Sequence, residues 1–256
     1  MGGYRILYTV CNKAERKSSE MIEPTLPALS CKGLWKTYKS QTALANVTLT
    51  VPRGRIVGLL GPNGSGKTTL MKLAADLLTP TQGEILVAGH QPGTYTKSIV
   101  SYLPERPYFS PSMKVSACLS MFADFYADFD RVAASDMLAR LGVSEQASFS
   151  ALSKGTKEKV QLVLVMARRA VLYLLDEPIG GVDPAARDYI LDTIISNYKA
   201  DATVLISTHL VADVEKVLDD YVFLQNGRIT ACASVASVPE TGCSSLDELF
   251  RRSFRC

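Results

Sequence analysis

The sequence predicts a layered α/β domain built on a mostly parallel sheet, with a helical subdomain inserted into it. Short apolar runs at residues 171–175, 203–207 and 221–225 are typical of buried parallel strands, and helical stretches separate them. An apolar strand at residues 55–60 leads directly into a glycine-rich loop, and a helix is expected at 66–78. The order strand, glycine loop and helix is the setting that a phosphate-binding loop requires.

The domain boundaries follow from changes in pattern along the chain. We expect an N-terminal extension at 1–28, a main domain at 29–250 with its helical subdomain at about 113–155, and a C-terminal tail at 251–256. Within the main domain, Ala45, Val47, Leu49 and Val51 alternate as in a strand.

The predicted helical subdomain contains helices at 115–129 and 131–141, the second ended by Gly142. In the first helix an aromatic stripe, spaced i, i+3, i+4 and i+7, consists of Phe122, Phe125, Tyr126 and Phe129. Such a stripe forms the core of the subdomain or, in part, meets a partner helix.

Composition excludes several classes of protein. Lysine and arginine number 28 against 25 acidic residues in 256, which is too even for a nucleic-acid binder. The basic excess lies in residues 1–40. Two interpretations of it are a solvated basic tail and a segment that contacts an anionic membrane surface. The six cysteines form no C-x-x-C pair, so neither a disulfide framework nor a metal cage is expected. We expect no signal peptide and no membrane-spanning segment.

The glycine loop carries the first chemical assignment. Residues 61–69 match G-x-x-x-x-G-K-[ST], in which backbone N–H groups and a helix N-terminus converge on phosphate oxygens. Lys67 provides charge for the β- and γ-phosphates, and the Thr68 hydroxyl provides a ligand for Mg²⁺. The predicted ATP contacts are Gly61, Asn63, Gly64, Ser65, Gly66, Lys67, Thr68 and Thr69.

Two carboxylates follow the apolar strand at 171–175. Asp176 is expected at the strand's C-terminal tip beside the phosphate loop, where it holds the Mg²⁺ shell. Glu177 lies one residue nearer the γ-phosphate and is placed to polarise an attacking water as general base.

The segment Leu152-Ser-Lys-Gly-Thr-Lys157 resembles the L-S-G-G-Q signature of ABC ATPases. The resemblance covers about residues 29–250 and implies a P-loop ABC ATPase core, with an antiparallel β subdomain beside the parallel sheet and the inserted helical subdomain. It also implies further nucleotide contacts. Tyr38 stacks on adenine unless it is a core tyrosine, and His209 contacts the γ-phosphate as a catalytic residue beside Glu177 and Lys67. Asp183 belongs to the D-loop, and the residues that contact the ATP of a second subunit are Ser153, Gly155 and Thr156.

Two departures from the family pattern stand out. Glu105 occupies the position where the family usually has a glutamine that approaches Mg²⁺, and it adds negative charge near a triphosphate. The signature has Lys154 for a glycine and Thr156 for glutamine. Lys-Gly signatures resemble those of ABC-2-type exporters, which favours export.

The resemblance therefore implies an ATPase that dimerises head to tail around two MgATP and drives a separate multi-span permease, from the cytoplasmic face of the membrane. Two alternatives remain open at this point. The first is a soluble ABC ATPase that regulates another process. The second is a regulatory subunit that binds ATP but hydrolyses it poorly.

Overall fold

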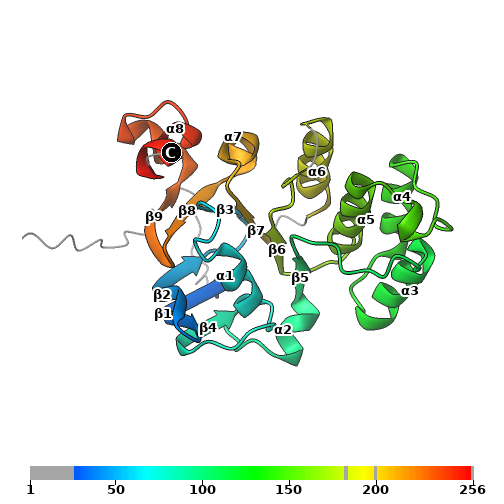
Figure 1. The fold of residues 1–256 in the computed structure, drawn as a ribbon, viewed down its shortest axis with the longest axis horizontal. Coiled ribbons are helices and arrows are strands. Elements are labelled where there is room, and N and C mark those ends of the chain that lie inside the picture. Colours follow the sequence, from blue (N-terminus) through cyan, green and yellow to red (C-terminus); the bar gives the residue numbers. More distant parts are fainter. Residues whose placement is uncertain (1–25, 182–183, 199–200, 255–256) are drawn as a thin grey trace, which may run out of the picture.

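The computed structural model describes residues 26–181, 184–198 and 201–254. Most of the expected N-terminal extension, and Asp183, therefore lie outside the described residues. Figure 1 shows two sheets packed around helix α1 and a group of helices at one end of the molecule. The helices are α1 (Lys67–Ala74), α2 (Thr94–Ile99), α3 (Val115–Phe125), α4 (Arg131–Arg140), α5 (Lys154–Met166), α6 (Pro184–Asn197), α7 (Val211–Val214) and α8 (Leu246–Phe254), with 3₁₀ turns at Phe149–Ala151, Glu215–Val217 and Val235–Thr241.

The larger sheet has six strands in the order β5-β6-β7-β3-β8-β9. All neighbours are parallel except β8 and β9, which form an antiparallel hairpin. The strands are β3 (Ile56–Leu60), β5 (Val100–Leu103), β6 (Leu172–Asp176), β7 (Thr203–Thr208), β8 (Asp220–Gln225) and β9 (Arg228–Ser234). The predicted parallel sheet is confirmed, and the four strands expected from apolar runs form within one residue of their predicted limits.

Helices cover both faces of this sheet. Successive residues of a strand point to opposite faces, so one strand can pack against helices on both sides. In β6, Leu172 and Leu174 pack in the cluster that contains α1, whereas Tyr173 and Leu175 pack in the cluster that contains α5 and α6. Continuous apolar strands are what burial on both faces requires. The five residues of β6 are all buried.

The smaller sheet is antiparallel, in the order β2-β1-β4. Its strands are β1 (Leu29–Tyr38), β2 (Gln41–Val51) and β4 (Gln82–Val87). The alternation predicted for 45–51 holds, because Ala45, Val47, Leu49 and Val51 are buried with exposed residues between them. Val47, Leu49 and Val51 pack in the cluster that contains α1 and strands of the larger sheet. The antiparallel subdomain that the family resemblance implied is therefore present.

The helices at the end of the molecule, α3 and α4, pack with one face of α5 around their own apolar cluster. The predicted first helix is too long, because α3 ends at Phe125 and Tyr126 is extended. The aromatic stripe is consequently split. Phe122 is buried, with the rings of Tyr126 and Phe129 centred 5.4 and 5.5 Å from its own, whereas Phe125 is 78% exposed.

One other predicted helix limit differs from the structure, and the expected C-terminal tail is partly helical. Helix α1 ends at Ala74 rather than at residue 78, and α8 extends to Phe254, so Arg251 and Arg252 of the expected tail lie in a helix. In α8 the apolar residues Leu246 and Phe250 are buried, and the ring of Phe254 packs edge-on against that of Phe223, which attaches the helix to the larger sheet.

Arg168, just after α5, joins the helical part to the larger sheet. Its guanidinium makes two hydrogen bonds to the Asp128 carboxylate, at 3.0 and 3.2 Å, and lies 3.8 Å from the centre of the Tyr126 ring. The same group donates to the backbone carbonyls of Ser98 and Val100. Arg168 is 3% exposed, so its planar fork of donors is used inside the protein.

Arg168→Met should destabilise the chain by about 3–5 kcal/mol, the usual cost of breaking a buried ion pair. Equilibrium urea unfolding measures the loss. Arg169→Met is the matched control, because Arg169 is exposed and pairs with Asp130 at the surface. The control should unfold almost as the wild type does, and an equal loss in both variants would contradict the role given to Arg168.

Candidate functional site

The loop between β3 and α1 is shaped so tightly that glycine is required at two positions. A Cβ on Gly61 would lie 2.2 Å from the carbonyl oxygen of Leu224. Gly66 has a φ of 109°, in the left-handed region, and a Cβ there would lie 2.5 Å from the carbonyl oxygen of Ala43. Because neither glycine has a Cβ, the loop lies directly against neighbouring backbone at both positions. This close approach holds the loop in one conformation at the start of α1.

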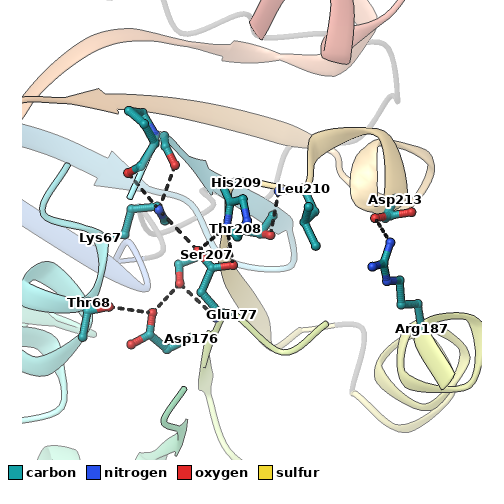
Figure 2. Close-up of polar contacts among 12 residues, drawn as sticks. Lys67, Thr68, Asp176, Glu177, Arg187, Ser207, Thr208, His209, Leu210 and Asp213 are labelled. Atoms are coloured by element: carbon teal, nitrogen blue, oxygen red, sulfur yellow. Dashed lines mark hydrogen bonds and ion pairs between the residues drawn. The ribbon is translucent and has the colours of Figure 1, made fainter. Parts of the chain in front are cut away.

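Lys67 begins α1 and folds back over this loop (Figure 2). Its Nζ donates to the carbonyl oxygens of Gly61 at 2.8 Å and Pro62 at 3.2 Å, and lies 3.3 Å from Glu177 Oε1. The lysine is 5% exposed. This buried ammonium group can exchange its hydrogen bonds to carbonyl oxygens for stronger hydrogen bonds to phosphate oxygens.

Asp176 ends β6 beside α1. Its Oδ1 accepts hydrogen bonds from the hydroxyls of Thr68, at 3.1 Å, and Ser207, at 2.5 Å, while its buried Oδ2 has no partner in the described chain. Burial raises the pKa of Asp176, and the charges of Glu177 and Glu105 raise it further, while the Ser207 and Thr68 hydrogen bonds lower it. Burial and the neighbouring Asp176 carboxylate raise the pKa of Tyr102, whose hydroxyl is also buried. A buried carboxylate next to a threonine hydroxyl fits the hard oxygen set that Mg²⁺ prefers.

Glu177 is turned out of the strand by its backbone, which has a φ of 49°. Its N–H donates to the carbonyl oxygen of Ser207 at 2.9 Å, and its carboxylate oxygens lie 3.1 and 3.2 Å from His209 Nδ1. A left-handed conformation is unfavourable for a residue other than glycine, at about 1–3 kcal/mol, and such strain is often found at functional sites. Glu177 thereby contacts both Lys67 and His209 (Figure 2).

A cavity of about 1000 Å³ lies over these residues. Of the predicted site residues, those that line it are Tyr38, Asn63, Gly64, Ser65, Gly66, Lys67, Thr68, Thr69, Glu105, Glu177 and His209. Tyr38, at the end of β1, is 42% exposed, so the alternative of a core tyrosine is wrong. Glu105, in the loop after β5, is exposed at the rim.

Of the signature segment Leu152–Lys157, Lys154 lines this cavity, whereas the predicted contacts Ser153, Gly155 and Thr156 do not. Ser153 caps the N-terminus of α5, where its Oγ accepts from the backbone N–H of Thr156 at 3.2 Å. Gly155 has open space around its Cα, because an added Cβ would meet no atom within 4 Å. In the described chain these residues thus form a free helix end rather than part of the chain's own phosphate site.

Sequence reasoning missed several residues of the cavity. Gln41, Thr42, Asn226 and Gly227 line it, the last two from the tight turn between β8 and β9. The Asn-Gly pair is a recognised hairpin signal, but only the tertiary structure brings this turn to the nucleotide loop, where Gly227 N donates to Ser65 O at 2.9 Å.

Removing the charge of Asp176 should stabilise the chain when nucleotide and metal are absent. Since burial raises the pKa of Asp176, ionisation destabilises the folded state progressively as the pH rises through that pKa. We therefore expect Asp176→Asn to raise Tm by about 2–4 °C, more at pH 8 than at pH 5. Differential scanning calorimetry in EDTA measures this. A gain that grows toward low pH would contradict it.

A strand, glycine loop and helix, with a carboxylate pair at the end of a nearby parallel strand, define a P-loop nucleotide-binding protein. Comparisons with known proteins specify the family. The family model described as ABC transporter matches residues 44–180. The uncharacterized ABC transporter ATP-binding protein YxlF of Bacillus subtilis (strain 168) is 33% identical over 208 residues, which cover 79% of this chain and 69% of that relative.

A second relative is the Nod factor export ATP-binding protein I of Ralstonia nicotianae (strain ATCC BAA-1114 / GMI1000), 31% identical over 79% of this chain and 65% of its own length. A solved structure of the ATP binding subunit of an ABC transporter superposes with a TM-score of 0.78 at 31% identity, and covers 88% of this chain and 98% of that one. This chain belongs to the ABC transporter ATP-binding family, whose domains bind nucleotide and generally hydrolyse ATP.

In the described residues no helix is long and apolar enough to cross a membrane. Nor does the described chain group three or more His, Cys, Asp or Glu side chains so that they hold a metal by themselves. A Mg²⁺ ion at Thr68 and Asp176 would therefore need phosphate oxygens and water to complete its ligands.

Proposed function

We propose that this chain hydrolyses MgATP to drive a separate membrane-spanning transporter subunit. The observation that carries the proposal is the position of Glu177, which contacts Lys67 and His209 next to the Thr68–Asp176 pair. These groups line or adjoin one cavity at the carboxyl ends of parallel strands, where ligands bind in open α/β sheets.

Each of these residues has a role that its contacts support. Glu177 accepts a proton from the attacking water, and His209 holds that carboxylate in place and contacts the γ-phosphate. Lys67 exchanges its carbonyl contacts for the β- and γ-phosphates. Thr68, Asp176 and Glu105 hold Mg²⁺, which offsets phosphate charge when it is bound. The exposed Tyr38 ring stacks on the adenine.

A second copy or a related subunit completes the site. Ser153, Gly155 and Thr156 lie at the free N-terminus of α5, which has no acidic residue in its first turn. Such an end favours an anion. We assign it to the γ-phosphate of the ATP bound by the opposite subunit, with Asp183 at the same interface, so that two chains enclose two ATP molecules head to tail.

A groove of about 450 Å³ between α1, β5 and α3 is the surface we assign to the transporter subunit. Apolar side chains dominate its lining, and Leu77 and Tyr108 are more than half exposed. The groove lies next to Glu105, in the loop that connects the larger sheet to the helical part, so closure around ATP would change its shape. The partner is a multi-span permease, which places this chain at the cytoplasmic face of the membrane.

Export is the direction we propose. The Lys154-Gly155 form of the signature supports it, and so does the similarity to a relative named for Nod factor export. Affinity purification from detergent-solubilised membranes should recover a multi-span protein together with this chain. Recovery of the chain with soluble proteins alone would argue for a regulator instead.

Glu177→Gln should bind ATP normally and hydrolyse it at least about 100-fold more slowly, because it keeps the hydrogen-bonding shape of the side chain but removes the base. Phosphate release measures the rate, and sedimentation with MgATP should detect a dimer that the wild type forms only transiently. Glu145→Gln, at a surface ion pair, is the control. A strictly monomeric Glu177→Gln protein would contradict the shared site.

Glu105→Gln should leave ATP hydrolysis near normal or raise it, because an amide oxygen still reaches the metal and one negative charge beside the triphosphate is lost. Steady-state phosphate release over a range of Mg²⁺ concentrations measures the effect. A loss as large as that of Glu177→Gln would make Glu105 the catalytic base, and would overturn the assignment of that role to Glu177.

A further inference from the structure

Tyr102, in β5, lies on the same face of the larger sheet as Asp176. The strands β5 and β6 are parallel neighbours, and Tyr102 pairs with Leu174. Leu174 belongs to the apolar cluster that contains α1, and the Tyr102 ring packs against that cluster. Asp176 follows Leu174 by two residues, so its side chain points to that face as well. The register of the two strands therefore brings the Tyr102 ring beside the carboxylate that ends β6.

The Tyr102 hydroxyl and Asp176 Oδ2 are complementary atoms. Both are buried, and within the described residues neither completes a hydrogen bond of good geometry. The hydroxyl is a donor and the carboxylate oxygen is an acceptor, so each can supply what the other lacks. Burial raises the pKa of Tyr102, and the negative charge of Asp176 beside it raises that pKa further. A buried phenol that stays neutral next to a carboxylate is available as a hydrogen-bond donor.

The other oxygen of the carboxylate, Asp176 Oδ1, is already held by two hydroxyls. Thr68, from α1, donates to it at 3.1 Å, and Ser207, from β7, donates to it at 2.5 Å. The terminal torsion of an aspartate side chain is broad, so contacts to one oxygen alone hold the carboxylate plane weakly. A donor on Oδ2, from β5, fixes that plane from the other side.

We propose that Tyr102 is a positioning residue for Mg²⁺: its hydroxyl donates to Asp176 Oδ2 and holds the carboxylate so that Oδ1, next to Thr68, is available to the metal. This role rests on the function proposed above, because it concerns the same metal carboxylate. Tyr102 lines the groove beside α1 and α3, whereas the described lining of the large cavity does not include it. Its hydroxyl therefore acts on the metal ligand and not on the nucleotide.

Tyr102→Phe tests this role, because it removes the hydroxyl and keeps the ring. Isothermal titration calorimetry with the non-hydrolysable ATP analogue AMP-PNP, in EDTA and in Mg²⁺, separates the two contributions to binding. The variant should match the wild type in EDTA and bind about tenfold more weakly in Mg²⁺, since hydrogen-bonded partners behind a metal ligand typically account for roughly 10- to 100-fold in metal affinity. Normal binding in EDTA also shows that the variant is folded.

Tyr108→Phe is the matched control. Tyr108 lines the same groove, but the neighbours that raise its pKa in addition to burial are Tyr126 and Cys118 rather than Asp176. The control should bind AMP-PNP as the wild type does in both conditions. Equal affinities of the wild type and Tyr102→Phe in Mg²⁺ would overturn the proposal. So would an equally large loss in EDTA or in Tyr108→Phe, because either result indicates a general effect on packing.

The Mg²⁺ dependence of ATP hydrolysis provides a second measurement. Tyr102→Phe should need about tenfold more Mg²⁺ for half of its maximal rate, with kcat at saturating Mg²⁺ within about threefold of the wild type. A fall in kcat that added Mg²⁺ does not restore would contradict a positioning role. The binding measurement needs no hydrolysis. A chain that binds AMP-PNP without turning over ATP would therefore overturn the proposed function and still test Tyr102.

Discussion

The parallel pairing of β6, β7 and β3 is the constraint on which the site depends. Because parallel strands present their carboxyl ends at one edge, the chain segments after β3, β6 and β7 meet there, although β3 ends at Leu60 and the other two end at Asp176 and Thr208. Ser207 at the end of β7 donates to Asp176, and the backbone of Glu177 donates back to Ser207. The middle strand thus positions both carboxylates against the phosphate loop of β3.

This convergence concentrates negative charge that the protein itself neutralises only in part. Lys67 and His209 contact Glu177, but one oxygen of Asp176 has no described partner and burial raises its pKa. The site therefore lowers the stability of the chain when cations and phosphate are absent, and their binding completes it. The left-handed backbone of Glu177 is also unfavourable for stability, and it directs the carboxylate toward Lys67.

The helical part is connected to this edge by few but strong contacts. Arg168 joins the segment between α3 and α4 to the backbone beside β5, and β5 leads directly into the loop that carries Glu105. A planar fork of donors held in a buried position is a rigid joint rather than a flexible one. Movement at the nucleotide cavity would therefore be passed to α3 and to the neighbouring groove as a rotation of packed elements.

The sequence by itself determined the features that are encoded over a few residues. Glycines at 61 and 66, the apolar strands and the carboxylates that follow residue 175 are local patterns, since backbone shape and burial on two faces restrict which residues fit. Helix lengths were less predictable: α3 stops at Phe125 because its aromatic neighbours turn back onto Phe122, a packing effect. Only the tertiary structure brought Asn226-Gly227 to the phosphate loop and buried Arg168 between the helical part and the larger sheet. Each of these contacts joins segments far apart in the chain, so its energy depends on the whole packed arrangement and leaves no periodic signal in the sequence.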